Sequence, residues 1–340
     1  MTRSINFGLW YDFRNPLPRA MSFETLYSET LLQMEWAETL GYDSVWFTEH
    51  HFCEDGYSPS PMIIASAIAQ RTKKLRIGTD LVLLPLADPI RLAEESATLS
   101  ILSGGRFDLG VGLGYRELEF EYFGRKISHR PSLMEEGVAL IRKAWTGENI
   151  EFHGKRFKVD NLSVQPTPEI LPKLYIGGHA QPAIERAARI ADGYLSGGRS
   201  HSEYVTALKK AGKRRSEGKI CAGNWWIIAD DPERELEQIG KHLLYQANQY
   251  ITWGAFGPPD QTPLFPDAKS AVEYGLYDLK DSAMAVSSLV AMLKEFPEII
   301  DVHFWAQFPG ENISSGNKRI EYIANRVIPE VREALALEES

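Results

Sequence analysis

The sequence predicts a single α/β domain, a (β/α)8 TIM barrel with insertions that spans residues 1–340. Strand-like runs alternate with helical patterns along the whole chain, and eight such pairs can be counted. A barrel of this kind needs about 250 residues. A chain of 340 residues with 44% hydrophobic content can therefore bury its core and still carry long insertions. A doubly wound open sheet is the alternative architecture, because the same alternation also fits an open parallel sheet.

Each expected strand is a short run of β-branched, aromatic or aliphatic residues between turn signals. In chain order the runs are residues 5–10, 44–47, 75–84, 106–111, 174–176, 193–195, 220–229 and 301–308. The third run contains Asp80, and a buried carboxylate is costly without a partner. We therefore expect a bulge or a ligand contact at that point.

The expected helices follow the strands and show apolar residues at helical spacing. They cover residues 23–40, 60–70, 90–102, 131–145, 182–191, 202–217, 232–250 and 281–295, and a last helix ends near residue 335. Ser22 and the pair Asp231-Pro232 are typical helix starts. Residues 146–172 and 251–280 do not fit the alternation, so we expect a small hairpin in the first segment and an aromatic, proline-rich excursion in the second.

Composition limits the classes of partner. The chain has 37 basic and 46 acidic residues, a net charge of −9, and no basic block, which argues against nucleic acid and anionic membranes. Its two cysteines, Cys53 and Cys221, form no paired motif, so we expect neither a disulfide scaffold nor a cysteine-rich zinc site. Met1 to Ser4 run directly into the first strand, and no apolar run reaches the length of a membrane span. We expect a cytoplasmic protein without a signal peptide.

The most informative stretch is the strand at 44–47 with the polar residues after it, Glu49, His50 and His51. Ligand sites of parallel α/β sheets lie beyond the carboxyl ends of the strands. Successive side chains of an extended strand point to opposite faces, so only one of the two histidines can face such a site. The alternative is that both are strand-end histidines bonded to backbone.

Three further stretches suit a ligand. The glycine-rich run 110–114 lets a flat ligand or a phosphate approach the backbone, and a plain tight turn is equally compatible with it. The run does not match the dinucleotide-binding pattern, because Tyr115 occupies the position of its third glycine. Residues 177–179 lie between a strand and a helix start, where an anion or an ordinary turn fits. Arg130 begins a helix and suits either a phosphate or the solvated surface.

Three sequence motifs together resemble the bacterial-luciferase-like flavin monooxygenases. They are SVWFTEHHF at 44–52, LLPLADPIRLAEE at 83–95 and LSGGRFDLGVG at 102–112. The resemblance extends over nearly the whole chain, including residues 310–329. It implies a (β/α)8 barrel that binds a flavin at the carboxyl ends of its strands and forms a homodimer.

The resemblance also implies roles for individual residues. His50, with Glu49, matches the catalytic histidine position, and Thr79 and Asp80 match the pair that passes beneath the flavin ring. The other implied cofactor-binding residues are Gly112, Gly114, Tyr115, Arg130, Gly178, His179 and Ala180, of which Arg130 and residues 178–180 match phosphate contacts. Luciferases carry Cys and Arg where this chain has Gly112 and Leu113, so light emission is not expected.

The implied reaction is the oxygenation of a small apolar aldehyde, ketone or similar compound. Reduced FMN from a separate flavin reductase would react with O2 to give a flavin peroxide, assisted by His50 and kept from water by residues 251–280. Deazaflavin-dependent hydride transfer on the same barrel and a non-catalytic flavin-binding subunit are the alternatives. A metal-dependent hydrolase fits poorly, because Glu49, His50 and His51 cannot converge on one ion, and we expect no metal.

Overall fold

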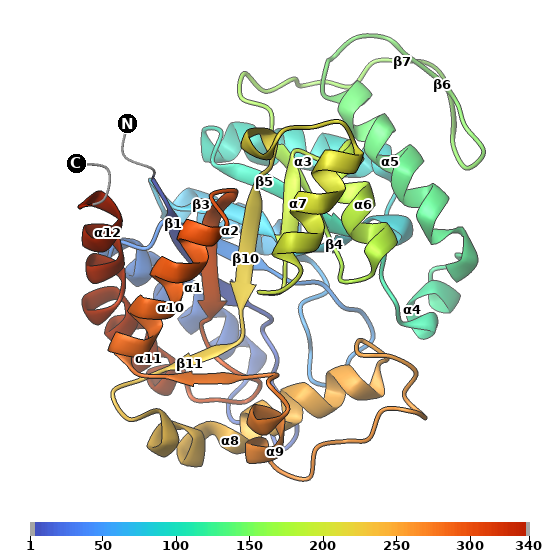
Figure 1. Ribbon diagram of the computed structural model, residues 1–340. Helices are drawn as coiled ribbons and strands as arrows, with labels where there is room; N and C mark the ends of the chain where they lie inside the picture. Colours follow the sequence, from blue (N-terminus) through green and yellow to red (C-terminus); the bar gives the residue numbers. More distant parts are fainter. Residues whose placement is uncertain (1–3, 338–340) are drawn as a thin grey trace.

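The computed structural model describes residues 4–337 and shows a closed barrel of parallel strands, as predicted (Figure 1). The expected lack of a signal peptide rests partly on residues 1–3, which lie outside the described residues. The barrel strands are β1 (Asn6–Tyr11), β2 (Ser44–Phe47), β3 (Arg76–Thr79) with its continuation β4 (Val82–Leu83), β5 (Phe107–Gly112), β8 (Lys173–Gly177), β9 (Gly193–Ser196), β10 (Ile220–Asn224) and β13 (Ile299–Trp305). Pairing of β3 with β5 and of β1 with β13 closes the sheet, which excludes the open alternative.

Helices surround the barrel because their buried residues form one apolar layer with the outer faces of the strands. The surrounding helices are α1 (Phe23–Thr39), α2 (Pro61–Arg71), α3 (Pro89–Ser103), α5 (Arg130–Ala144), α6 (Gln181–Ile190), α7 (His201–Lys210), α10 (Ser282–Glu295), α11 (Ile313–Arg326) and α12 (Ile328–Ala336). Ser22 and Asp88 cap α1 and α3 with their side chains, as these residue types favour. Short 3-10 turns occupy Leu84–Leu86, Ile127–His129 and Arg215–Glu217. No helix within residues 4–337 is long and apolar enough to cross a membrane.

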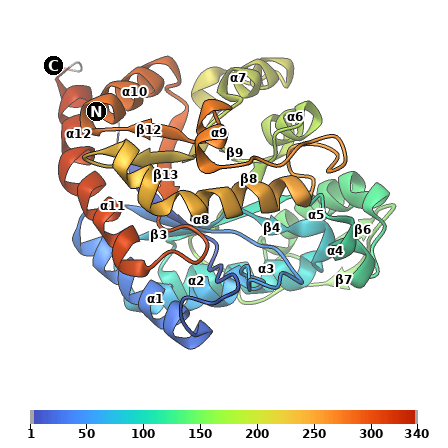
Figure 2. The ribbon, with the colours of Figure 1, turned by 90° about the horizontal axis from the view of Figure 1, so that it is seen from below.

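The insertions lie at the periphery. The antiparallel hairpin of β6 (Ile150–His153) and β7 (Lys158–Leu162) projects beside α5, as expected for residues 146–172 (Figure 1). Seen from below, α8 (Pro232–Thr252) lies across the barrel (Figure 2). The strands of the barrel point toward α8 and its neighbours, which include α9 (Ala268–Glu273) and the two-stranded sheet of β11 (Trp226–Ile228) and β12 (Asp278–Lys280) (Figure 1). The excursion at residues 251–280 thus contains the short helix α9 and the strand β12.

Two expected strands are interrupted. The run 75–84 breaks at Asp80 and Leu81, which are joined by a cis peptide bond, so β3 and β4 are separate. The run 220–229 breaks at Trp225, because β11 leaves the barrel and pairs with β12. Both breaks lie at the carboxyl end of the barrel.

The helix expected at 202–217 and the final helix were also predicted wrongly. α7 ends at Lys210, and Gly212 follows with a φ of +74°, a left-handed conformation that ends helices. The final helix is two helices, α11 and α12, because Pro329 lacks a backbone N–H and can stand only in the first turn of a new helix. The short helix α4 (Glu117–Tyr122) was not expected at all.

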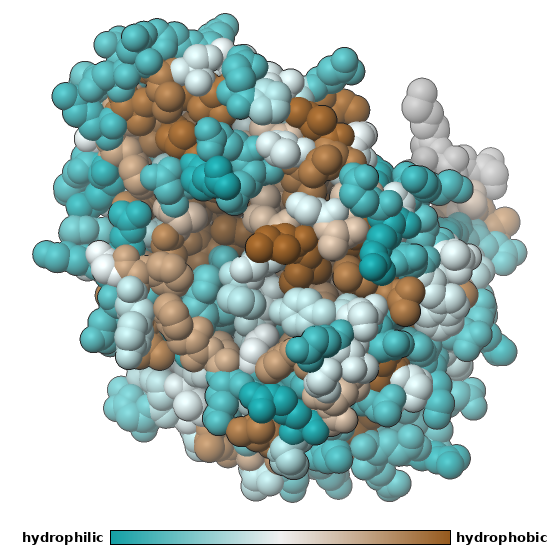
Figure 3. All heavy atoms as spheres, turned by 180° about the vertical axis from the view of Figure 1, so that it is seen from behind, coloured by the Kyte–Doolittle hydropathy of each residue, from teal (hydrophilic) through white to brown (hydrophobic). Residues whose placement is uncertain are grey.

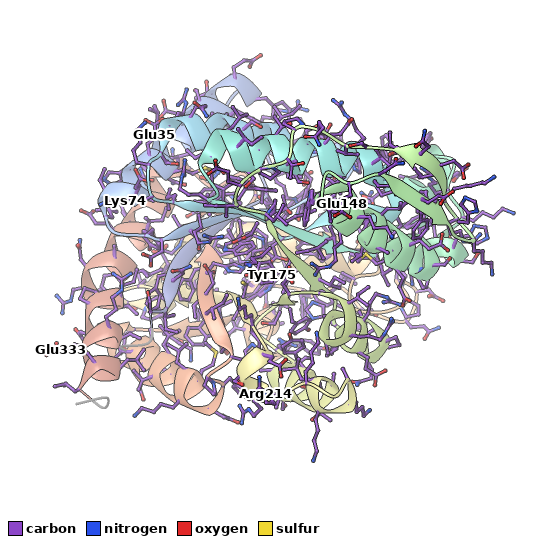
Figure 4. The ribbon with its side chains drawn as sticks, turned by 90° about the horizontal axis from the view of Figure 1, so that it is seen from above. Glu35, Lys74, Glu148, Tyr175, Arg214 and Glu333 are labelled. Carbon is purple, nitrogen blue, oxygen red and sulfur yellow. The ribbon has the colours of Figure 1, made fainter. Side chains whose placement is uncertain are left out.

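The interior of the barrel is not purely apolar. Tyr175 of β8 lies among the side chains that fill the centre in Figure 4, whereas Glu35, Arg214 and Glu333 lie at the periphery. Its ring contacts the edge of Trp46, and the Trp46 ring stacks on His303 at 5.2 Å between centroids. A layer of large polarisable side chains thus closes the inside of the barrel beneath its carboxyl end.

Candidate active site

A cavity of about 330 Å³ opens at the carboxyl ends of the barrel strands, within the size range of small-molecule sites. Most of the residues that the sequence singled out line it. They are Glu49, His50, Asp80, Gly114, Tyr115, Arg130, Gly178, His179 and Ala180. These residues follow four different strands, so the fold brings together motifs that are distant in sequence.

Thr79 and Gly112 do not line the cavity. Thr79 is fully buried, and its hydroxyl donates to the Gly110 carbonyl at 2.8 Å and accepts from the Gly110 amide at 2.9 Å. A Cβ on Gly112 would lie 2.4 Å from the Leu81 side chain, which does face the cavity. Both residues shape the floor of the cavity from behind.

His50 is held in one orientation by a carboxylate that the sequence reasoning missed. Its Nδ1 lies 2.8 Å from Oε1 of Glu119 in α4, and the same oxygen accepts from the His51 amide and from Arg116. Because this oxygen only accepts, Nδ1 carries the proton and Nε2 is left as an acceptor. The Tyr115 hydroxyl lies 3.0 Å from Nε2 and donates to it.

The charge state of this group follows from its surroundings. Burial lowers the pKa of His50 below its ordinary value, and the Glu119 carboxylate offsets that effect only in part. Burial acts to raise the pKa of Glu119, but the hydrogen bonds from His50 and the His51 amide and the charge of Arg116 hold it below its ordinary value. The pair is therefore a neutral imidazole on a carboxylate at neutral pH, and Nε2 can accept a proton.

Glu49 and His51 point elsewhere. Glu49 accepts a hydrogen bond from the Leu83 amide, and its other oxygen lies 3.4 Å from Nε2 of His51. The His51 ring packs edge-on against Phe123 and does not line the cavity. Of the two adjacent histidines, His50 faces the cavity and His51 does not. Glu49 borders the cavity, and its bond to the Leu83 amide fixes β4.

One end of the cavity suits an anion. The Arg130 side chain lines it and is held by the Gly114 carbonyl at 3.0 Å. α6 begins after Ala180, which also lines the cavity and whose side chain caps no amide. Pro182 lacks an N–H and the Ala183 amide donates to the Ala180 carbonyl, so the Gln181 amide is the donor that this helix start leaves for a ligand. Gly178 has a φ of +140°, and a Cβ there would lie 2.9 Å from Ala183, so only glycine keeps the backbone in this place.

The floor of the cavity is a buried charge chain. Asp80 borders the cavity and lies 3.2 Å from Nε2 of His303, whose Nδ1 lies 2.9 Å from Asp301. Burial acts to lower the pKa of His303, but the two carboxylates raise it above its ordinary value. Asp80 thus has the partner that its position in a buried run required.

The opposite end of the cavity is a wall of aromatic side chains, which we call the aromatic wall. It comprises Trp10, Tyr57, Trp225, Tyr250 and Phe256. Only Phe256 belongs to residues 251–280, the excursion that was expected to keep water out. The other four come from segments that carry no local sequence signal of a ligand site. In the sequence, each is an aromatic residue of the kind that ordinary strands, helices and loops contain.

The residues present fit a flavin. A flat ring system needs a narrow space between rigid walls, which the glycines at the strand ends and the aromatic side chains provide, and its phosphate needs the cation and amides found at Arg130 and α6. Within residues 4–337, side chains with metal-ligand spacing occur only at Glu151, His153 and Asp160 on the exposed hairpin, which does not contribute to the cavity.

Comparison with known proteins gives the family of the chain. The model of the family described as luciferase-like monooxygenase matches residues 5–283, so residues 310–329, which we had included in the resemblance, lie beyond it. The F420-dependent glucose-6-phosphate dehydrogenase of Amycolatopsis mediterranei is 33% identical over 53% of this chain and 57% of its own length. The alkanal monooxygenase alpha chain of Photorhabdus luminescens is 37% identical over 38% of this chain and 36% of its own. This chain therefore spans only about half, or less, of the length of these two curated relatives.

A solved structure supports the fold over the full length. The oxygenating constituent of 3,6-diketocamphane monooxygenase from Pseudomonas putida, a type II Baeyer-Villiger monooxygenase solved in complex with FMN, superposes with a TM-score of 0.77. The superposition covers 97% of this chain and 99% of that one at 17% sequence identity. At this identity the likeness concerns the barrel and not the reaction.

We predict that Glu119→Gln frees the His50 ring. The amide cannot hold Nδ1–H as the carboxylate does, so both neutral tautomers become populated and the pKa of His50 falls further, since burial then acts with less opposition. Nitrogen-15 NMR of the histidine rings over a pH series measures both effects. Glu117→Gln, an exposed position of the same helix, is the control and should leave the His50 signals in place. Identical His50 spectra in the two variants would contradict the assignment.

Proposed function

The chain belongs to the luciferase-like monooxygenase family, and from this premise we propose that it is a flavin-dependent monooxygenase that uses reduced FMN and O2 to oxygenate a small apolar organic substrate. Membership places it among oxidoreductases, whereas FMN as the cofactor and oxygenation as the reaction are our proposal. The observation that carries it is a neutral, oriented His50 in a cavity that is lined both by Arg130 and by the aromatic wall.

The proposed cofactor contacts follow from the cavity. Arg130 and the start of α6 would hold the phosphate, Gly114, Tyr115 and Gly178 would let the cofactor approach the backbone, and Asp80 would lie at the floor. Reduced FMN supplies the electrons that activate O2, which protein side chains cannot do. The carbonyl and amide groups at the strand ends are fixed by the barrel and cannot adapt, so the site is preorganised.

The chain's own residues have two tasks. Nε2 of His50 accepts or returns a proton, with the Tyr115 hydroxyl beside it and Glu119 holding the tautomer. The aromatic wall keeps water away, because Trp225 and Phe256 line the cavity with apolar ring surface. Exclusion of water protects reactive oxygen species from unproductive loss.

Deazaflavin-dependent hydride transfer is the second candidate, and the dehydrogenase relative favours it. The same anion-binding end would serve that cofactor. A sugar phosphate as substrate fits less well, because Arg130 is the only Arg or Lys among the cavity residues of the described chain, and it is needed for the cofactor. A non-catalytic flavin-binding subunit is the third candidate, and the oriented His50 argues against it, since a flavin carrier needs no such group.

The partners are also proposals. A separate flavin reductase would supply reduced FMN, and we place the enzyme in the cytoplasm, where that reductase would work. Cys53 and Cys221 are free thiols in the structure, as a reducing compartment allows. A homodimer would use exposed apolar residues such as Ile63 of α2 and Ile101 and Leu102 of α3. Apolar side chains do gather among polar ones on the face opposite to the view of Figure 1 (Figure 3).

A first test of the proposed function concerns the identity of the cofactor. Purified protein titrated with reduced FMN should bind it more tightly than the reduced deazaflavin and should take up O2 after binding. Binding is followed by absorbance and O2 by an electrode. Preference for the deazaflavin without O2 uptake would assign the protein to hydride transfer. Binding of neither cofactor would remove the flavin assignment.

The second prediction concerns the phosphate. Arg130→Ala should weaken FMN binding about tenfold or more, because a charge-assisted hydrogen bond contributes about 1.5–3 kcal/mol. Riboflavin, which lacks the phosphate, should bind the variant and the wild type alike. Lys126→Ala removes an exposed cation from the same connection and serves as the control. Equal losses for FMN and riboflavin would show that Arg130 shapes the cavity and does not bind the phosphate.

The third prediction concerns the proton. His50→Ala should lower turnover with any substrate by about 10²- to 10⁴-fold, the usual contribution of a positioned acid or base. FMN affinity should change little, since Arg130 and α6 lie at the other end of the cavity. His153→Ala on the exposed hairpin is the control. Unchanged turnover in His50→Ala would remove His50 from the mechanism.

A further inference from the structure

The aromatic wall contains a pair of hydroxyl groups. Tyr57 follows the loop after β2 and Tyr250 lies near the end of α8, and their oxygens are 2.9 Å apart. Both residues border the cavity although they are only 3% and 8% exposed. One hydroxyl donates to the other, so the pair has one proton left for a third oxygen. Burial raises the pKa of both tyrosines, which therefore remain donors at neutral pH.

A buried cation lies behind the pair. The Arg14 guanidinium is fully buried, and its carbon lies 5.1 Å from the centre of the Tyr57 ring and 5.7 Å from that of Tyr250. Nε donates to Asp55 at 2.6 Å, while Nη1 and Nη2 have no hydrogen-bond partner. Arg14 does not border the cavity. Asp55 balances its charge, so Arg14 acts on the pair through its contacts with the two rings, which hold the tyrosines in place.

The rings around the pair select for shape. Trp225 meets Tyr250 edge to face at 5.6 Å, Trp10 meets Trp225 edge to face at 6.4 Å, and the His50 ring stands nearly perpendicular to Tyr57 at 4.8 Å. Such an arrangement leaves ring edges and faces directed at the cavity, and these attract another aromatic ring beyond the area that it buries. A flexible alkyl chain gains only the free energy of burying its apolar surface, and it loses conformational entropy when it is bound in one conformation.

The charges near this end exclude anions. Among the cavity residues of the described chain, Arg130 is the one Arg or Lys, whereas two carboxylates, Glu49 and Asp80, border the cavity. A substrate that carries a carboxylate or phosphate would meet repulsion without a partner charge. An uncharged ligand with a single oxygen finds both an apolar surface and a donor.

We propose that the Tyr57–Tyr250 hydroxyl pair binds the oxygen atom of an uncharged, planar aromatic substrate, a phenol or an aryl ketone, and so selects this class over aliphatic aldehydes. The inference rests on the proposed function, because it assigns the aromatic end of that site to the substrate. Tyr57 and Tyr250 are then residues that determine specificity, and Arg14 is a positioning residue that acts through them.

Two probes of the same shape test the proposal, 2-naphthol and 2-methylnaphthalene, which differ only in the oxygen. Calorimetric titration of the wild type should show 2-naphthol binding about five- to tenfold more tightly, and decanal should bind more weakly than 2-naphthol. The double variant Tyr57→Phe, Tyr250→Phe should lose the preference, with 2-methylnaphthalene binding unchanged within about twofold. The double variant removes both hydroxyls together. It therefore leaves no buried hydroxyl that has lost its partner, and it should fold.

Controls make the outcomes distinct. Tyr245→Phe removes a hydroxyl that bonds Asp55 on the other side of Arg14, outside the cavity, and should keep the preference. Circular dichroism and FMN titration accompany each variant. Retention of the preference in the double variant, its loss in Tyr245→Phe, tighter binding of decanal, or no binding of either probe by the wild type would each overturn the proposal. Failure of the wild type to bind any flavin, with the preference intact, would overturn only the proposed function.

Discussion

The charge chain from Asp80 through His303 to Asp301 is the constraint on which the rest of the site depends. It joins the end of β3 to β13 across the barrel, and Asp301 also accepts from the Ser44 hydroxyl and the Trp46 ring nitrogen of β2. All of these groups are buried, so loss of one member would leave an uncompensated charge, at a cost of about 3–5 kcal/mol. The three side chains of this charge chain can therefore neither rearrange nor bond to other groups. The floor of the cavity that they form keeps one shape.

That rigid floor explains how the two ends of the cavity can differ so strongly. The anion end is built mostly of backbone, with glycines that no side chain can replace without collision, as at Gly178. The aromatic end is built of side chains carried by β1, α8 and the connections after β2 and β10. Backbone placed by the barrel fixes where the cofactor can lie, whereas side chains on the connections are free to change the substrate without disturbing it.

The sequence predicted the barrel, and it picked out residues that line the cavity, such as Arg130 and Gly178, because their signals are local. The strand Ser44–Phe47 was predicted without error, because a run of β-branched and aromatic residues before a polar cluster is typical of a buried strand. Asp80 was expected to need a partner, but nothing near residue 303 could identify it, because the two are 223 positions apart. Glu119 was missed for the same reason, and its short helix α4 has too few turns to show an apolar period. Where the prediction failed, the structure is set by contacts between distant segments rather than by propensity.

The position of α8 shows how such distant contacts determine chemistry. Its amphipathic pattern and the Asp231 cap predict a helix and say nothing about where that helix lies. Only its packing across the barrel brings Tyr250 to 2.9 Å from Tyr57, 193 positions earlier in the chain, and places Tyr245 against Asp55 and Arg14. The packing of one helix thus brings scattered tyrosines together into a hydroxyl pair beside His50. The substrate end of the site is in this sense a property of how the insertion packs, and the cofactor end is a property of the barrel itself.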